Sequence, residues 1–428
     1  MDAEPAAVAA RVVELLRDGR FADVERMLAP PLRAVASAKT LRAGWEGGLS
    51  ETGPVSAVGA PVCETPAGGL VRVGVPVTGE RGGLTVVMSV DATGLLHGLR
   101  LAHGPDAEWT PPPYAPPGTF DEEEVVVGSG PLAVPGTLSL PRGPGAGPGV
   151  VLLSGGGPFD RDATFGPNKP LKDLAWGLAC GGVAVLRFDK VTYAHAEQVA
   201  ARGDLTMSAE YVPHAVAAVR LLQGHPAVDA RRVYVAGHSM GGKVAPMVAA
   251  AEPSVAGLAL LAGDAEPMHR AAVRVVRHLA SIGALPADAV ETIRRQAALI
   301  DGPGLSADTP AAELPFGYPA AYWLELRDYD SVAAAAALGK PMLILQGARD
   351  YQVTVADDLA LWRKGLAGRP GVTIRVYDAD DHLFFPGSGP STPSGYQAPQ
   401  HVDPAVVGDL TDWLTSPRGE AQRAGERG

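Results

Sequence analysis

Apolar positions follow two different periodicities in the first quarter of the chain. Up to about residue 45 they recur every three to four residues, as at Val8, Val12 and Leu15, which predicts helices. After Gly53-Pro54 they form short runs separated by glycine-rich turns, which predicts strands at residues 55–63, 70–77, 84–89 and 95–102. Helices followed by an antiparallel meander predict a small α+β unit over residues 1–104.

A proline-rich segment, residues 105–118, ends this unit. It contains Pro111-Pro-Pro-Tyr-Ala-Pro-Pro117, which excludes a helix or an interior strand. We expect an interdomain linker that polyproline geometry makes semi-rigid. A second Gly/Pro stretch, residues 141–149, lies between predicted strands at 132–140 and 149–153. It predicts a long hairpin loop.

Strands and helices alternate over most of the remaining chain. Continuous apolar runs occur at residues 150–153, 183–186, 233–236, 257–261, 342–345 and 373–377. Helical periodicity separates several of them, at residues 171–180, 209–223, 242–251 and 355–366. Because most of these runs are apolar on both faces, we expect a sheet covered by helices on both sides. Residues 119–428 therefore predict a doubly wound α/β domain.

An insertion interrupts this alternation at about residues 264–330. It holds two helical segments, residues 271–282 and 288–300, and the aromatic run Phe316-Gly-Tyr-Pro-Ala-Ala-Tyr-Trp323. An insertion between late strands is typical of a cap over a site. Aromatic side chains of the cap and loops would line an apolar pocket of acyl or polyketide size, or else anchor the cap. The candidates are Phe159, Phe165, Phe316, Tyr318, Tyr322, Trp323 and Phe384.

The strongest chemical signal is Gly237-His-Ser-Met-Gly241, between the apolar run 233–236 and an alanine-rich helix. This is a GxSxG nucleophile elbow, in which Ser239 occupies a strained strand-to-helix turn. The turn needs Gly237 and Gly241 because a Cβ there would collide with neighbouring backbone. The helix that follows directs its N-terminal amides at developing negative charge.

A serine hydroxyl also needs a base and an acid, which in this fold class follow the nucleophile in the order acid, then histidine. Asp350 and His382 each come just after a predicted strand, at the sheet edge where α/β sites form. Asp350 would orient the imidazole, and His382 would act as general base and then general acid. The alternatives are that Asp350 is a turn residue and that one of Asp378, Asp380 and Asp381 caps a turn or supplies the acid.

Other histidines compete less well for the role of base. His238 points the other way along the turn and is expected to be structural, while His401 lies in a polar C-terminal loop.

The anion hole requires two backbone amides. One should come from Met240, and the other from the loop Ser154-Gly-Gly-Gly-Pro-Phe-Asp160, with Gly156 favoured over Gly157. The alternative is an ordinary flexible loop. Neither GxGxxG nor GxxxxGK[ST] occurs there, which disfavours a phosphate or dinucleotide site.

Composition narrows the class of protein. The 428 residues suggest two domains, and the net charge of −11 argues against a nucleic-acid partner. No apolar stretch is long enough to cross a bilayer and no secretory signal is recognisable, so we expect a cytoplasmic protein. Cys63 and Cys180 are expected to be small buried residues rather than a disulfide. We expect no metal, since the Asp378–Asp381 cluster lacks a calcium-loop pattern, and no cofactor.

These motifs together resemble the α/β-hydrolase family, in particular bacterial esterase-like members with a nuclear-transport-factor-2-like cone in front. The resemblance covers about residues 125–414, and the cone is suggested by pattern and position only. It implies that Ser239, Asp350 and His382 form a catalytic triad. The matching stretches are residues 154–162, 168–178, 185–190, 237–242, 346–350 and 382–384. Two departures are Ser154, where many members have a histidine, and Lys243, where an apolar residue is usual.

The leading hypothesis is therefore a serine hydrolase that cleaves a small-molecule carboxylic ester, or a thioester or lactone, through an acyl-enzyme. A biosynthetic enzyme using the same triad for acyl elimination or cyclisation in secondary metabolism is the alternative, and a non-catalytic binding protein is a third. The first 104 residues would shape the pocket entrance or support a homodimer.

Overall fold

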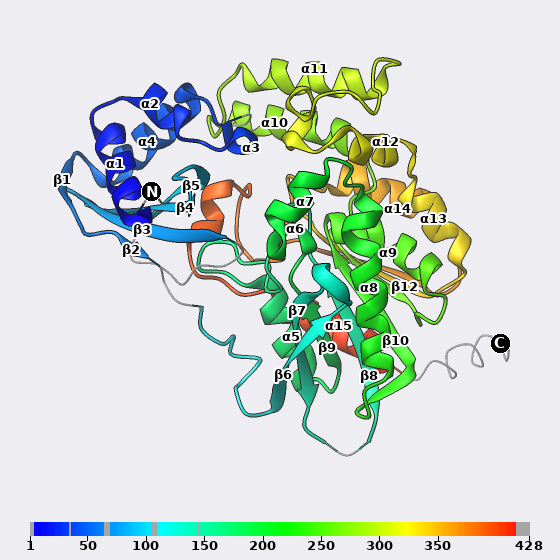
Figure 1. Ribbon diagram of the computed structural model, residues 1–428. Coiled ribbons are helices and arrows are strands. Elements are labelled where there is room, and N and C mark those ends of the chain that lie inside the picture. The colour runs from blue at the N-terminus through cyan, green and yellow to red at the C-terminus, as the bar shows by residue number, and fades with distance from the viewer. Residues whose placement is uncertain (1–3, 34–35, 64–68, 104–108, 144, 417–428) are drawn as a thin grey trace, which may run out of the picture.

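The computed structural model describes residues 4–33, 36–63, 69–103, 109–143 and 145–416. These residues form two separate sheets, each with its own hydrophobic core. The smaller sheet and its helices lie at one side of the molecule in Figure 1, and the larger sheet with its covering helices makes up the rest.

The N-terminal unit packs helices on one face of an antiparallel sheet. Its helices are α1 (Pro5–Arg17), α2 (Phe21–Arg26), α3 (Pro30–Arg33) and α4 (Ala38–Thr52). Its strands are β1 (Val55–Val58), β2 (Val62–Cys63), β3 (Leu70–Gly79), β4 (Gly82–Asp91) and β5 (Leu96–His103). The order is β1-β3-β4-β5, with β2 also paired to β3. Val12 and Trp45 of the helices share one core with Val75 and Val86 of the sheet, as the change of periodicity predicts.

The described part of the predicted linker is packed rather than free. Trp109 donates from Nε1 to Asp173 Oδ1 at 2.7 Å, and its ring meets Trp176 edge to face. Ala115 is fully buried. Residues 109–118 therefore lie against α5 (Pro170–Cys180) of the larger unit.

The larger sheet has eight strands in the order β13-β12-β11-β10-β8-β9-β7-β6. They are β6 (Phe120–Val127), β7 (Val134–Pro141), β8 (Gly147–Leu153), β9 (Ala184–Phe188), β10 (Val228–His238), β11 (Leu258–Leu261), β12 (Met342–Gly347) and β13 (Val372–Tyr377). All neighbouring pairs from β13 to β9 are parallel, whereas β6 and β7 are antiparallel. The predicted strands from residue 150 onward are thereby confirmed.

The predicted hairpin across residues 141–149 is wrong. β7 and β8 are not neighbours, because β9 pairs with both and lies between them. β7 instead forms a hairpin with β6, a strand in the stretch Phe120–Val127 that the apolar pattern missed because three glutamates and an aspartate occupy it.

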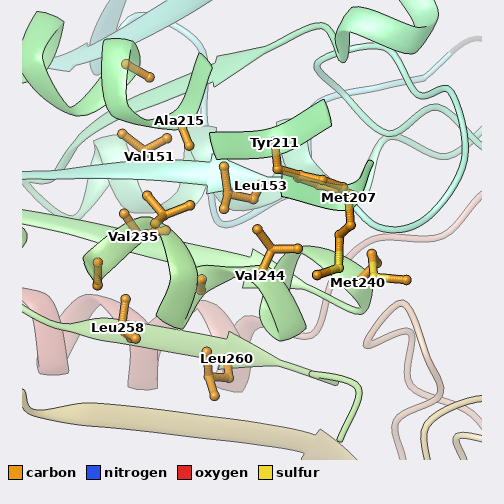
Figure 2. Close-up of a cluster of buried hydrophobic side chains, with 14 of the residues drawn as sticks. Val151, Leu153, Met207, Tyr211, Ala215, Val235, Met240, Val244, Leu258 and Leu260 are labelled. Atoms are coloured by element: carbon orange, nitrogen blue, oxygen red, sulfur yellow. The ribbon is translucent and has the colours of Figure 1, made fainter. Parts of the chain in front are cut away.

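Helices cover both faces of this sheet, as its doubly apolar strands predict. α5 and α15 (Pro404–Thr415) pack on one face, while α8 (Met207–Gln223) and α9 (Met240–Ala251) pack on the other. Figure 2 shows the core on the α8 and α9 face of the sheet, a single cluster that includes Val151, Leu153, Val235, Met207 and Met240. The sheet edge that carries the loops after β10, β12 and β13 is consequently held from both sides.

Further short helices complete this unit. They are η1 (Gly130–Leu132), α6 (Val191–Ala194), α7 (Ala196–Arg202), the π-helix η4 (Val355–Leu359), α14 (Ala360–Gly365) and η5 (Pro393–Gln397).

The insertion between β11 and β12 is helical. It contains α10 (Met268–Ser281), α11 (Ala289–Asp301), η2 (Ala311–Glu313), η3 (Pro315–Gly317), α12 (Ala320–Asp328) and α13 (Ser331–Leu338). Lys39 of α4 pairs with Asp288 at 3.1 Å, so the N-terminal unit touches this insertion. In Figure 1 the N-terminal helices lie beside α10 and α11.

Two further expectations concern membranes and cysteines. None of the helices within the described residues is long and apolar enough to span a membrane. Both cysteines are free, but Cys63 is exposed on the short strand β2, which corrects the expectation that it is buried.

Candidate active site

Ser239 lies between the end of β10 and the first residue of α9, with φ of 55° and ψ of −121°. A non-glycine residue with positive φ is strained and persists only where the surrounding structure fixes it. Here a Cβ on Gly237 would collide with the Gly241 carbonyl, and one on Gly241 would lie 2.6 Å from the Leu153 carbonyl oxygen. The two glycines of the motif are therefore sterically required.

Asp350 and His382 are hydrogen-bonded to each other. His382 Nδ1 lies 2.7 Å from Asp350 Oδ2, and both side chains are buried. The other oxygen, Asp350 Oδ1, accepts the amides of Gln352 and Val353 at 2.7 and 3.0 Å. Because an ionised carboxylate only accepts hydrogen bonds, the imidazole must carry its proton on Nδ1, which leaves Nε2 as the basic nitrogen.

The pKa of His382 reflects opposing influences. Burial lowers it, but the charge and hydrogen bond of Asp350, with Asp264 and Asp381 adding, outweigh burial and raise it above the usual 6.5. Asp381 itself accepts the amides of Leu383 and Phe385, so it caps the turn that holds His382. Asp378 is exposed.

His238 lies closer to this pair than the sequence suggests. Its ring centroid is 4.7 Å from that of His382, and its Nε2 donates to the His382 carbonyl oxygen at 2.8 Å. It therefore points toward His382, not away along the turn. Burial, with the neighbouring His382, lowers its pKa to about 3, so His238 stays neutral and supports the His382 backbone. His401 is remote from Ser239 and contacts Asp173.

The Ser239 hydroxyl donates to a residue that the sequence analysis did not single out. Ser239 Oγ lies 3.3 Å from Oδ1 of Asp264, three residues past β11. A hydroxyl has a single hydrogen, so in this arrangement Ser239 does not donate to His382. Burial raises the pKa of Asp264 to about 6, although the nearby charge of Lys243 opposes the shift.

Lys243 is buried on α9, and its ammonium donates to the Glu266 carbonyl oxygen at 3.1 Å. Burial lowers its pKa, and the charge of Asp264 is the largest of the influences that oppose this shift. The expected cation near the nucleophile helix is thus present, on the side of the helix that faces the loop after β11.

Two glycines of the loop after β8 lie against the nucleophile. A Cβ on Gly155 would be 3.2 Å from Ser239 Cβ, and one on Gly156 would be 3.7 Å from Met240 Cβ. The Met240 amide, at the first position of α9, has no acceptor within its helix. The Gly157 amide donates to the Tyr318 hydroxyl of the cap. Of the two expected glycines, Gly156 is the one whose Cβ position would contact Met240.

The buried ion pair of Lys190 and Glu210 helps to hold the loop after β8 in place. The Gly155 carbonyl accepts from Lys190 Nζ at 3.0 Å and from Tyr211 Oη at 2.7 Å. Lys190 also donates to Tyr211 Oη at 2.7 Å and pairs with Glu210 at 2.9 Å. All three hydrogens of the Lys190 ammonium thus have an acceptor, so the buried charge is compensated. Glu210 also accepts from Tyr322 of α12 at 2.9 Å.

A cavity of about 600 Å³ opens onto these residues. Its polar lining residues include Ser239, His382, Asp264 and Asp358, and most of the other lining residues are apolar. The lining includes four of the expected aromatic residues and apolar side chains of α10: Phe159, Phe165, Phe316, Tyr318, Met268, Ala271, Ala272 and Val275.

Three expected pocket residues do not line this cavity. Tyr322, Trp323 and Phe384 are at most 1% exposed. Tyr322 is held by Glu210 and packs flat on Tyr318, and Trp323 lies in the same core. Phe384 belongs to the core on the opposite face of the sheet. These three residues anchor the cap and the His382 loop.

Two residues near the nucleophile, Asp264 and Lys190, were not predicted, because the sequence marks each of them only weakly. Asp264 follows a buried strand exactly as Asp350 does, and the same strand-end argument would have selected it. Lys190 follows β9, but nothing in the sequence pairs it with Glu210 or with Gly155. Within the described residues, no group of three or more His, Cys, Asp or Glu side chains is arranged to hold a metal ion.

Comparisons with known proteins identify the family of this chain. Residues 150–393 match the sequence profile of the alpha/beta hydrolase family. Esterase EstD of Thermotoga maritima is 37% identical over 308 residues, which span 72% of this chain and 70% of EstD.

Solved structures give weaker likenesses. Est1E from Butyrivibrio proteoclasticus is 16% identical, covers 68% of this chain and 99% of its own, and has a TM-score of 0.45. The Pyrococcus furiosus esterase PF2001 is 17% identical, covers 73% of this chain and 100% of its own, and has a TM-score of 0.43. The family profile and the relationship to EstD place this chain in the alpha/beta hydrolase family.

Proposed function

We propose that this carboxylic ester hydrolase works through an acyl-enzyme formed on Ser239, with His382 as general base and Asp350 as the residue that orients His382. The observation that carries the proposal is the 2.7 Å hydrogen bond between Asp350 and His382, where His382 lines one cavity together with a strained Ser239. A nucleophile, a base and an orienting carboxylate are the parts that acyl transfer requires.

In the first step the hydrogen of the Ser239 hydroxyl turns from Asp264 to His382 Nε2. The serine oxygen then attacks the ester carbonyl, and the proton passes to His382. Asp350 stabilises the imidazolium that forms, because its charge already raises the pKa of His382. His382 next returns the proton to the departing alcohol, and a water activated by the same base hydrolyses the acyl-enzyme.

The oxyanion would be bound by the amides of Met240 and Gly156. Their positions on α9 and on the loop after β8, with side chains 3.7 Å apart if Gly156 carried a Cβ, support this assignment. Gly157 would contribute only if the Tyr318 hydroxyl released its amide. Thioesters and lactones present the same carbonyl chemistry and belong to the proposed substrate range.

The test is replacement of the nucleophile. Ser239→Ala should lower kcat on p-nitrophenyl butyrate by roughly 10⁴ to 10⁶ while leaving the thermal melting curve unchanged. A fluorophosphonate probe should label the wild type on Ser239, located by peptide mass spectrometry, and should spare the variant. Persistent labelling of Ser239→Ala would place the nucleophile on another residue.

We also infer that the N-terminal unit, similar in its order of elements to a nuclear-transport-factor-2-like cone, shapes the cavity entrance or supports a homodimer. Its contact with the cap through Lys39 and Asp288 supports a role at the entrance. The residues proposed for chemistry all follow β8. A chain beginning near Trp109, which keeps the segment packed on α5, should therefore differ from the full chain in KM or oligomeric state more than in kcat when it is assayed on the same ester and sized by light scattering.

A further inference from the structure

We propose that Asp264 selects the acyl group of the substrate: the enzyme favours acyl chains that carry a hydrogen-bond donor, a hydroxyl or an ammonium group, on the carbons next to the scissile carbonyl. This inference rests on the proposed function, because it assumes that the acyl carbon becomes bonded to Ser239. It names the chemistry of the substrate, which the triad alone leaves open.

Asp264 is a cavity-wall carboxylate with spare accepting capacity. Only its Oδ1 is engaged, by the Ser239 hydroxyl at 3.3 Å, and its Oδ2 has no hydrogen-bond partner among the described residues. Its backbone is fixed, since its amide donates to the Ser239 carbonyl oxygen and its own carbonyl accepts from Ser331 at 3.4 Å. The side chain is therefore held at one place beside the nucleophile.

The other carboxylate in the cavity wall, Asp358, is saturated. Its Oδ1 accepts the amides of Ala265 and Glu266 at 3.0 Å each, and its Oδ2 accepts from the Thr354 amide and from Arg274. Asp358 is thus a structural anchor. Among the described residues that line the cavity, Asp264 is the carboxylate that still has an oxygen available for a substrate.

No lysine or arginine lines the cavity within the described part of the chain. Lys243 lies behind Asp264, and its ammonium is bonded to the Glu266 carbonyl oxygen instead. An anionic acyl group would therefore meet Asp264 with no cation beside it in the cavity wall. A neutral donor or a cation is the complementary ligand.

Distance makes the contact feasible. Once the acyl carbon is bonded to Ser239 Oγ, its α and β carbons lie within two or three bonds of that oxygen. Asp264 Oδ1 is 3.3 Å from the same oxygen. A donor on either carbon can therefore reach Asp264, while the carbonyl oxygen points at the amides of Met240 and Gly156.

The contact would also favour the chemical step. In the structure Asp264 takes the hydrogen of the Ser239 hydroxyl, which His382 needs. A substrate donor bonded to the free Oδ2 withdraws negative charge from the carboxylate, so Oδ1 holds that hydrogen less strongly. Donor-bearing acyl groups should consequently raise kcat as well as lower KM.

The experiment uses the full chain and four p-nitrophenyl esters of similar size: butanoate, 3-hydroxybutanoate, 3-aminobutanoate and the hemisuccinate. We expect the wild type to hydrolyse the hydroxy and amino esters with kcat/KM about tenfold or more above butanoate, as a hydrogen bond to a charged group allows, and the hemisuccinate more slowly than butanoate.

Variants separate charge from hydrogen bonding. Asp264→Leu should abolish both preferences, whereas Asp264→Asn should keep part of the preference for the hydroxy ester, since its amide oxygen still accepts, and lose that for the amino ester. Asp330→Asn is the matched control: Asp330 contributes to the charge around Lys243 and caps α13 through the Ala333 amide, but it does not line the cavity. Its ester ratios should equal those of the wild type.

Equal kcat/KM for the butanoate, hydroxy and amino esters in the wild type, or ratios that survive Asp264→Leu, would overturn the inference. If Asp264→Leu does not fold, Asp264→Asn and the wild-type ratios still decide it. Failure of the proposed function looks different, because the fluorophosphonate probe would then label a residue other than Ser239 and would still label Ser239→Ala.

Discussion

Tyr211→Phe removes one hydroxyl next to the oxyanion loop and should slow catalysis while leaving substrate binding almost unchanged. Tyr211 lies on α8, and its hydroxyl both donates to the Gly155 carbonyl and accepts from Lys190. In Tyr211→Phe the carbonyl keeps the Lys190 hydrogen bond at 3.0 Å, so the loop retains one of its two anchors. The neighbouring Gly156 amide should then be less precisely held.

The contacts of Tyr211 indicate how much folding stability and how much kcat the substitution should cost. Two buried hydrogen bonds are lost, and the loss of the second leaves one donor of the Lys190 ammonium without an acceptor; together these changes should cost about 1 to 3 kcal/mol of folding stability. Complete loss of an oxyanion donor costs about 10² to 10³ in kcat. Because one anchor of the loop survives, we expect kcat to fall by about tenfold and KM to change little.

The assay is steady-state hydrolysis of p-nitrophenyl butyrate, combined with urea unfolding. Tyr377→Phe is the control, because the Tyr377 hydroxyl is also hydrogen-bonded, to Asp409 at 2.7 Å, but lies outside the cavity wall. It should lose stability without losing kcat. If Tyr211→Phe leaves kcat at the wild-type value while lowering stability, the network beneath Gly155 supports the fold only.

Three further results are expected. His382 must be neutral to accept a proton, and its pKa is raised above 6.5, so kcat/KM should fall as pH decreases through an apparent pKa above 6.5. Asp350→Asn should lower this apparent pKa and should lower kcat by about 10⁴. A pH profile that does not move in Asp350→Asn would contradict the pairing of Asp350 with His382. Gly241→Ala, whose Cβ would lie 2.6 Å from the Leu153 carbonyl oxygen, should lose about 3 kcal/mol or more in urea unfolding, whereas Gly156→Ala, with an ordinary 3.7 Å contact, should fold normally. Burial and the Asp403 carboxylate raise the pKa of Asp380 from 3.8 to about 7, so Asp380 lowers stability progressively as pH rises from about 4 to about 7 and by a constant amount above that. Asp380→Asn should therefore raise stability at pH 8 by about 1 kcal/mol or more, and should raise it less at pH 5.

Local patterns predicted the parts of the molecule that depend on local physics. A strand that is apolar on both faces has to be buried, and Gly237 is required by sterics within the turn itself, whereas Gly241 is required by its approach to the loop after β8. The positions of β8 to β13 and the elbow followed from such patterns. The bond between Asp350 and His382 was also anticipated, because parallel strands bring their carboxyl ends to one edge.

Features that depend on contacts distant in sequence were not predictable in this way. β9 inserts between β7 and β8 although both strands precede it in the chain, so proximity in sequence suggested a hairpin that does not form. Phe316 and Trp323 are equally aromatic, but one is exposed at the cavity and the other is fully buried. Only the packing of α12 against the core decides between the two positions.

The carboxylate of Glu210 has a consequence for altering the range of esters that the enzyme accepts. One of its oxygens pairs with Lys190, and the other accepts a hydrogen bond from Tyr322 on α12. The same buried carboxylate therefore holds both α12 of the cap and the lysine that supports the loop after β8. α10, in contrast, contributes to the cavity wall with small and flexible apolar side chains. We therefore expect laboratory evolution toward new substrates to accumulate substitutions on α10. Substitutions at Tyr322 of α12 would be selected against, because they would slow the hydrolysis of every substrate.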